Sequence, residues 1–221
     1  MNPLKQLFAT VVIASFVLLA KADGLEALDA FIKTAHSGRA NFTQVLTSPP
    51  REGQSARSKT SSGTFEFVRP NRFKFVYRKP FEQSIVADGQ TLWLYDVDLN
   101  QVTARKQSKA LGATPAALIA AAPDLRALQA EFTLSSAPDM DGLQWVQALP
   151  KSKDGQLQSV RVGFRLAEKS AIKTTELAAL EILDSFGQRS LLRFSRVEVN
   201  ATLSGDAFQF KPHPGAEVIR P

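Results

Sequence analysis

The chain of 221 residues contains no cysteine and only two histidines, His36 and His213. The absence of cysteine excludes disulfide bonds, thiolate metal sites, cysteine nucleophiles and a lipid-modified N-terminal cysteine. The two histidines lie far apart in the sequence, so nothing local supports a shared site. The sequence also lacks a Gly-x-Ser-x-Gly elbow, a Walker phosphate loop and a His-Glu-x-x-His motif. We therefore expect no catalytic residues, no metal site and no cofactor, and a protein that is not an enzyme.

A strong excess of charge of one sign is also missing. Charged residues make up 22% of the chain and hydrophobic residues 44%, which is typical of a folded globular protein and not of a disordered chain or an integral membrane protein. Basic residues outnumber acidic ones by 6, but the two kinds alternate along the whole sequence. A nucleic-acid-binding protein usually has a concentrated basic face, so nucleic acid is not an expected partner.

The clearest apolar run lies near the start of the chain. Lys5 precedes residues 7–19, which are apolar, and Ala20-Lys21-Ala22 has the small-x-small arrangement of an export-signal cleavage site. About 13 apolar residues are fewer than the ~20 that span a bilayer as a helix. We predict that residues 1–22 are a cleaved signal peptide and that residues 23–221 form a single domain. Export of such a long chain without disulfides indicates the periplasm of a Gram-negative cell.

One longer helix is predicted after the signal peptide. From residue 25 to residue 35 the apolar side chains recur at steps of three and four, and Gly38 is the expected stop. Two short helices are predicted later in the chain, over residues 116–121 after Pro115 and over residues 123–130. The apolar face of the first helix must pack on another part of the fold.

From residue 41 onward the hydrophobic period changes to two, which indicates β-strands with one apolar face. Asp88-Gly89 is a strong hairpin signal, and the polar residues 47–63 are expected to form a solvated hairpin loop. About ten strands are predicted, and consecutive strands are expected to pair antiparallel because parallel pairing needs long crossovers. Besides the alternating phenylalanines discussed below, the candidate strands are residues 84–87, 91–95, 101–106, 131–135, 143–149, 160–166, 177–183, 190–200 and 207–211.

These elements predict a large antiparallel sheet that curls, with its concave face covered by the helices. The chain has 15 phenylalanines, and many of them fall on one parity of the strands. Periodicity alone favours a well-packed core of these rings. It also permits a lipid-sized cavity, because alanine-rich helices opposite large side chains need not fill the space.

Several short motifs follow one another along the chain. The sequence RPNRF at residues 69–73 is followed by DGQTLWLY at residues 88–95 and QVT at residues 101–103. NFTQ at residues 41–44 and TPAALIA at residues 114–120 lie on either side of them. Each motif is short, but together they span nearly the whole chain after residue 22. In this order the motifs resemble those of the LolA family of periplasmic lipoprotein carriers.

The resemblance implies a mostly β fold with a few α-helices: an incomplete, unclosed antiparallel β-barrel with a helical lid over a hydrophobic cavity. Members of the family are carriers and not enzymes. They accept acylated lipoproteins from an ABC-type release complex in the inner membrane and deliver them to the outer-membrane receptor LolB. The resemblance therefore implies a periplasmic lipoprotein chaperone, which we expect to be a monomer.

The resemblance also assigns site residues. Arg69 matches the arginine that holds the lid closed, and Phe73 lies where the family has an aromatic residue at the cavity entrance. The lid segment is expected at Leu118, Ile119 and Ala120. The residues expected to line the acyl-chain cavity are Leu28, Phe31, Phe65, Phe67, Phe73, Phe75, Trp93, Val162 and Phe164. The facing of Trp93 and Tyr95 stays open, because Leu92 and Leu94 make both faces of their strand apolar.

Two other functions remain compatible with the sequence. One is a carrier of a different lipid, such as a glycolipid or hopanoid, and the other is a lipoprotein-sensing regulatory module of the same fold. The C-terminal segment departs from the family pattern, with Ala216-Glu217 where Val-Asp is more usual. That departure leaves open how this end of the chain docks.

Overall fold

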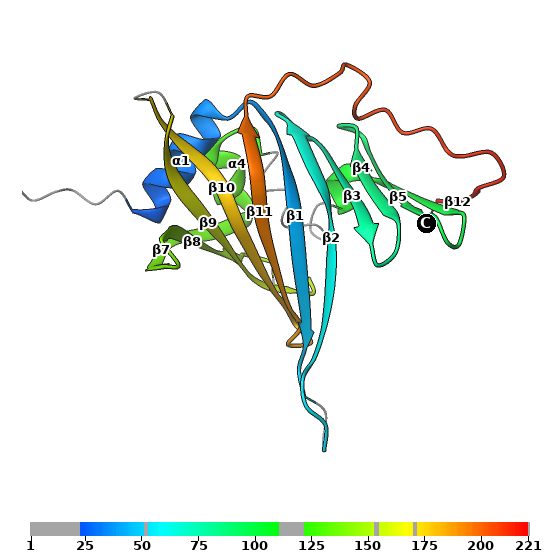
Figure 1. Ribbon diagram of the computed structural model, residues 1–221, viewed down its shortest axis with the longest axis horizontal. Coiled ribbons are helices and arrows are strands. Elements are labelled where there is room, and N and C mark those ends of the chain that lie inside the picture. The colour runs from blue at the N-terminus through cyan, green and yellow to red at the C-terminus, as the bar shows by residue number, and fades with distance from the viewer. Residues whose placement is uncertain (1–22, 51–52, 111–121, 153–154, 170–171, 221) are drawn as a thin grey trace, which may run out of the picture.

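The computed structural model describes residues 23–50, 53–110, 122–152, 155–169 and 172–220 (Figure 1). Its strands and helices follow the chain in this order: α1 (Gly24–Thr34), β1 (Ser37–Ser48), β2 (Arg57–Val68), β3 (Arg72–Lys79), β4 (Gln83–Ala87), β5 (Thr91–Asp96), β6 (Gln101–Lys106), α2 (Gln107–Ala110), α4 (Leu125–Glu131), β7 (Phe132–Met140), β8 (Leu143–Pro150), β9 (Leu157–Lys169), β10 (Ile172–Asp184), β11 (Arg189–Val199) and β12 (Glu217–Ile219). Among these described residues, no helix combines the length and the apolar character that a membrane crossing requires.

The strands form one twelve-stranded sheet in the order β12-β6-β5-β4-β3-β2-β1-β11-β10-β9-β8-β7. All neighbouring pairs are antiparallel except β12 and β6, which are parallel. The sheet curls strongly, and its outermost strands β7 and β12 lie apart at opposite ends (Figure 1). The predicted unclosed antiparallel barrel is confirmed.

Helix α1 begins where the side chain of Asp23 accepts a hydrogen bond from the Glu26 amide at 3.0 Å. Its apolar stripe is buried against β7, β8, β9 and β10. Gly24 permits this close docking, because a Cβ atom at that position would lie 2.0 Å from the carbonyl oxygen of Trp145 in β8. The predicted helix is confirmed.

The expected stop at Gly38 is wrong, because Gly38 lies inside β1 and the helix is capped by Ala35. A Cβ atom at Gly38 would lie 2.6 Å from the ring of Phe67 and 3.1 Å from the Glu198 carbonyl oxygen. Glycine is therefore needed at this position for close packing and not for ending a helix.

Helix α4 confirms the short helix predicted after Pro123. It begins at Leu125, because the Asp124 side chain caps it by accepting a hydrogen bond from the Ala127 amide at 2.8 Å. Leu128 is its buried residue. The other predicted short helix, over residues 116–121, lies outside the described residues.

One loop prediction and one strand prediction are corrected by the structure. The polar stretch expected as a loop over residues 47–63 is strand at both of its ends, because β1 and β2 stay paired as far as Ser48 and Arg57. The strand expected over residues 207–211 is wrong, since turn hydrogen bonds such as Ala207 N to the Ser204 carbonyl oxygen (3.1 Å) hold this segment. The last strand forms further on, at β12.

Candidate functional site

The concave face of the sheet carries one large apolar cluster, which we call the concave cluster. Eight of the nine residues predicted for the acyl-chain cavity belong to it, and each is at most 5% exposed. Their rings pack closely: Phe65 and Phe75 are 4.4 Å apart between centroids, and Phe31 in α1 is 5.4 Å from Phe164 in β9. The eight residues are Leu28, Phe31, Phe65, Phe67, Phe73, Phe75, Val162 and Phe164.

Trp93 is the exception and its placement is a correction. It pairs with Val86 and Ala104 on the face of the sheet opposite Phe73 and Phe75, because side chains alternate along a strand. Its ring stacks on Phe210 at 5.3 Å, and its Nε1 donates to Asp88 Oδ2 at 2.9 Å. Tyr95 lies on the same face and stacks on His213. Trp93 therefore cannot line the concave cluster.

Phe73 does not stand exposed at an entrance. Its exposed fraction is 0%, and its ring makes an edge contact with Phe75 at 6.2 Å between centroids. It lies at the start of β3, directly after the turn that carries Arg69. In this structure Phe73 is part of the packed interior.

Arg69 joins the covering elements to the sheet. Its Nε donates to the carbonyl oxygen of Ala35 at 2.8 Å, and its Nη1 donates to the carbonyl oxygen of Ala122. Ala35 caps the C-terminus of α1, where a cation is favoured by the helix dipole. Ala122 begins the segment that leads into α4. One side chain therefore links the β2–β3 turn to the covering elements on both sides of it.

The guanidinium of Arg69 lies in apolar surroundings. Its central carbon is 5.2 Å from the ring centroid of Phe31 and 5.5 Å from that of Phe67. Burial lowers the pKa of Arg69 to about 10, so the side chain stays charged at neutral pH. The Arg69 amide also donates to the His36 carbonyl oxygen at 2.8 Å, which fixes the turn beside the end of α1.

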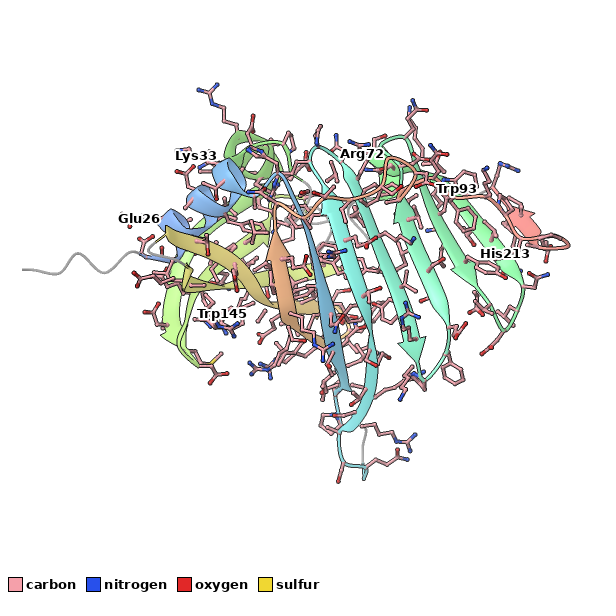
Figure 2. The ribbon with its side chains drawn as sticks, turned by 45° about the horizontal axis from the view of Figure 1, so that its top comes forward. Glu26, Lys33, Arg72, Trp93, Trp145 and His213 are labelled. Carbon is pink, nitrogen blue, oxygen red and sulfur yellow. The ribbon has the colours of Figure 1, made fainter. Side chains whose placement is uncertain are left out.

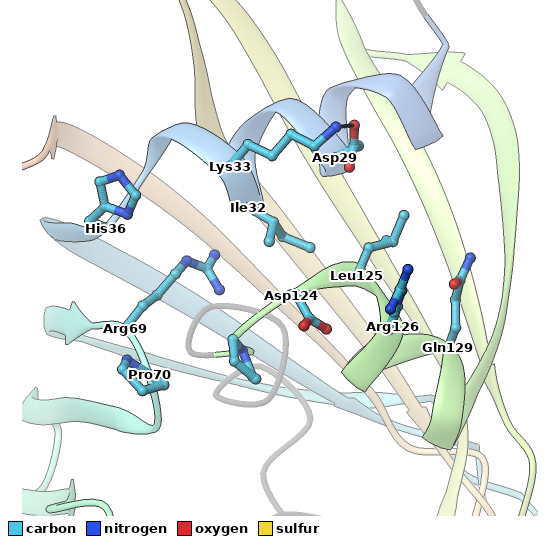
Figure 3. A pocket seen from close by; sticks show the side chains of 11 residues that line it. Asp29, Ile32, Lys33, His36, Arg69, Pro70, Asp124, Leu125, Arg126 and Gln129 are labelled. Carbon is cyan, nitrogen blue, oxygen red and sulfur yellow. Dashed lines mark hydrogen bonds and ion pairs between the residues drawn. The ribbon is translucent and has the colours of Figure 1, made fainter.

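A pocket of about 820 Å³ opens beside Arg69, between the end of α1 and the start of α4 (Figure 3). Ile32 and Leu125 give it apolar walls, while Lys33, Asp29 and Arg126 give it charged ones. Lys33 and Asp29 form an ion pair at 2.6 Å. In Figure 3 the side chain of Arg69 extends from the turn toward this space.

The hollow within the concave cluster is much smaller. The space bordered by Phe31, Phe65, Phe67, Leu177 and Phe194 measures about 10 Å³, which is about the room that a single water molecule needs. A hydrocarbon chain can enter this part of the cluster only if the rings and their cover move apart. This hollow by itself is too small to hold a hydrocarbon chain.

Further along the concave face the side chains become more polar. Gln44 and Leu46 continue β1 beyond Phe42, and Ser61 and Lys59 precede Phe65 on β2 with the same facing. These four residues line a second pocket of about 580 Å³. Tyr77 lies where the two regions meet, 5.0 Å from Phe42 between ring centroids, and burial raises its pKa to about 12. The concave face is thus most apolar under α1 and near Arg69.

Sequence reasoning missed several residues of this site. Phe42 and Phe194 belong to the concave cluster, and period-two alternation on β1 and β11 could have identified both. The carbonyl partners Ala35 and Ala122 carry no signal in their side chains. The predicted lid residues Leu118, Ile119 and Ala120 lie outside the described residues.

Within the described ranges, no three His, Asp or Glu side chains come together as a metal site would require.

Comparison with known proteins gives a consistent result. Residues 33–211 match the family model of the outer membrane lipoprotein carrier protein LolA. The chain is 73% identical over 213 residues to an outer-membrane lipoprotein carrier protein of Albidiferax ferrireducens, covering 96% of this chain and 98% of that one. It is 52% identical to the protein of the same name from Methylibium petroleiphilum, covering 90% and 91% of the two chains.

A solved structure supports the fold alone. An uncharacterized conserved protein from Thermus thermophilus superimposes with a TM-score of 0.52 at 12% sequence identity, over 89% of this chain and 98% of that one. The family match and the two close relatives cover far more than half of the sequence. The chain belongs to the LolA family of outer-membrane lipoprotein carrier proteins.

Proposed function

We propose that this protein is a periplasmic carrier that shields the acyl chains of lipoproteins during their transfer to the outer membrane. The names of its close relatives support the lipoprotein cargo. The observation that carries the proposal is the concave cluster itself: an apolar surface of phenylalanine rings, covered by α1 and tied to its cover through Arg69.

Such a surface suits hydrocarbon for a simple physical reason. Each methylene group that leaves water contributes about 0.8 kcal/mol, so the chains of one lipid anchor are worth tens of kcal/mol when fully buried. A carrier must recover part of that free energy and yet release the chains to the next acceptor. Phenylalanine rings provide nonspecific apolar contact, and their own packing in the empty protein competes with the cargo.

Arg69 is the proposed latch of the empty state. Hydrogen bonds to a charged group contribute about 1.5–3 kcal/mol each, and Arg69 donates two to carbonyl oxygens on opposite sides of the cover. Opening the concave cluster requires that at least one of them break. The two hydrogen bonds therefore stabilise the closed, empty form relative to the open, loaded form. This difference favours release of the cargo.

The route of the cargo follows from the same proposal. The carrier receives acylated lipoproteins from an ABC-type release complex in the inner membrane, and it delivers them to the receptor LolB at the outer membrane. Residues 1–22 act as the cleaved export signal, and residues 23–221 form the carrier domain, which acts as a monomer. The proposed activity is binding and transfer, without a chemical reaction.

The test is competition for the apolar surface. An environment-sensitive fluorescent fatty acid is bound to the purified mature protein, and a triacylated lipopeptide is added. We expect the lipopeptide to displace the probe, whereas the same peptide without acyl chains does not. Failure of the lipopeptide to displace the probe would contradict the proposal. Co-purification of free glycolipid or hopanoid instead of lipoproteins from periplasm would favour a carrier of another lipid.

A further inference from the structure

The guanidinium of Arg69 has hydrogen-bonding capacity that the closed structure does not use. Arginine has five N–H donors and no acceptor. Nε and Nη1 donate to Ala35 and Ala122, but the Nη2 atom is buried and has no hydrogen-bond partner among the described residues. An unsatisfied buried donor on a charged group is costly. A further acceptor at this position would therefore be stabilising.

Opening the cover leaves Arg69 with even fewer hydrogen-bond acceptors. When the segment at Ala122 separates from α1, Arg69 loses an acceptor while its guanidinium still lies beside the rings of Phe31 and Phe67. A charge in such surroundings must find new partners or water. Any ligand that fills the opened concave cluster also keeps water out of it, so the ligand itself is the natural source of acceptors.

The chemistry of an acylated glycerol fits this position. Each ester-linked chain begins at a carbonyl oxygen, which is a neutral acceptor placed where the hydrocarbon ends. With the chains on the phenylalanine rings, the ester groups fall at the edge of the concave cluster, where the guanidinium stands 5.2 Å from Phe31. The pocket of about 820 Å³ on the other side of Arg69 has room for the remaining polar part of the ligand.

We propose that Arg69 has a second role as a ligand-binding residue: in the loaded carrier its guanidinium donates hydrogen bonds to ester carbonyl oxygens of the bound lipid, in place of the carbonyl oxygens of Ala35 and Ala122. This inference rests on the proposed carrier function. The same N–H donors of Arg69 would then bind the cover in the empty state and the ester groups in the loaded state. A neutral acceptor suits the site better than a multiply charged anion, since Lys33 beside it is already paired with Asp29.

The test compares two ligands that differ only in those carbonyl groups. One is a lipopeptide whose glycerol carries two ester-linked palmitoyl chains, and the other is its dialkyl ether analogue with chains of equal length. Dissociation constants are measured by displacement of a fluorescent fatty acid from the mature protein. We expect the wild-type protein to bind the ester about tenfold more tightly, which corresponds to about one hydrogen bond to a charged group.

Variants of Arg69 separate the two roles of the residue. A residue that is only a latch changes the affinity for ester and ether by the same factor, so the ratio of the two affinities stays as in the wild type. We expect Arg69→Leu to abolish the ester preference, and Arg69→Lys to keep part of it because lysine still donates but lacks the planar fork. Arg72→Leu is the matched control, because Arg72 lies three residues on and faces Phe208 on the convex side.

The outcomes are distinct. An unchanged ester preference in folded Arg69→Leu, or no preference in the wild type, would overturn the second role while leaving the carrier function intact. Loss of the preference in Arg72→Leu would overturn it as well, since the effect would then not belong to Arg69. If the wild-type protein bound neither lipopeptide, the proposed carrier function would fail and this inference with it.

Discussion

The two faces of the sheet both carry aromatic rings beneath a covering segment, but the rings and their covers differ in kind. On the concave face the rings are mainly phenylalanines, covered by α1. On the convex face, two rings of β5 pack against rings that the C-terminal segment lays over them (Figure 2). We call this second group of rings the convex cluster, and its members are Trp93, Tyr95, Phe208, Phe210 and His213.

The difference in residue type has a physical consequence. Trp93 Nε1 is bonded to Asp88 Oδ2, and Tyr95 Oη donates to Asn100 Oδ1 at 3.2 Å. Phenylalanine has no polar atom that must keep a partner. The rings of the concave cluster can therefore exchange one apolar cover for another, whereas the convex cluster is fixed by its hydrogen bonds.

The two covers are also attached to the sheet in different ways. The C-terminal segment ends in β12, which adds to the sheet through main-chain pairing with β6, and the Glu217 amide donates to the Asn100 carbonyl oxygen at 3.0 Å. On the concave face the cover is held largely by side-chain hydrogen bonds: Arg69 donates to the carbonyl oxygens of Ala35 and Ala122, and Asn200 Nδ2 donates to the Thr34 carbonyl oxygen at 2.9 Å. We infer that the concave cover is built to be displaced and the convex one to stay.

The largest effect is expected from a charge inside the concave cluster. Phe73→Glu places an unpaired carboxylate at a fully buried position, and we expect the free energy of unfolding to fall by more than about 4 kcal/mol. Urea denaturation followed by circular dichroism measures this. Lys74→Gln, on the opposite face one residue further along β3, should change stability by less than about 1 kcal/mol. Equal stability of the two variants would contradict the assignment of Phe73 to the packed interior.

The next effect concerns binding. Without its latch the Arg69→Leu protein should open more readily, and we expect it to hold the dialkyl ether lipopeptide about tenfold more tightly than the wild type does. Release to an acceptor should slow accordingly. The ether ligand is chosen because it reports the latch without the ester contact. Wild-type retention by a correctly folded Arg69→Leu protein would contradict the latch role of Arg69.

A smaller effect is expected on the convex face. Phe210→Ala removes the ring that stacks on Trp93 and contacts Tyr95, and we expect a loss of about 1–3 kcal/mol in the free energy of unfolding. Lipopeptide affinity should stay at the wild-type level, because the convex cluster does not contact the concave one through these rings. A weakened affinity measured under conditions where the variant is fully folded would mean that the convex cover also takes part in loading.

The two clusters also differ in how far the sequence could predict them. Alternation with a period of two placed Phe65, Phe67, Phe73 and Phe75 on one face, because a strand turns successive side chains to opposite sides. Trp93 could not be placed this way, since Leu92 and Leu94 make both faces of β5 apolar. Its facing is decided by Phe210, a partner that lies far along the chain.

The polar contacts of the site were predictable only in part. The resemblance to a known family singled out Arg69 as the residue that holds the lid closed. The particular acceptors are main-chain oxygens of Ala35 and Ala122. Every residue has such an oxygen, so only the three-dimensional arrangement can identify which ones are used. The three-residue strand β12 was not predicted, because it is too short to show a periodic pattern.

The smallest expected effect tests whether the polar contacts of the convex cluster stabilise the fold. Burial favours the neutral form of Asp88, but hydrogen bonds from the Thr91 amide, Trp93 Nε1 and the Gln90 amide outweigh it and hold the pKa of Asp88 below its ordinary value of 3.8. A carboxylate with a lowered pKa in the folded state stabilises the fold above that ordinary value, and the stabilisation is lost as the pH falls through the lowered one.

Stability of the wild type should therefore decline below about pH 4, and Asp88 should account for at most about 1 kcal/mol of the decline because its carboxylate is largely solvated. Urea denaturation at pH 7 and pH 3 measures the decline, which should be smaller in Asp88→Asn than in the wild type. Asp98→Asn, at an exposed position in the β5–β6 turn, is the matched control. Since Asp88 holds Trp93 on the convex face, lipopeptide affinity at neutral pH should be unchanged in Asp88→Asn. A carrier whose loading depended on both faces would instead lose affinity together with stability.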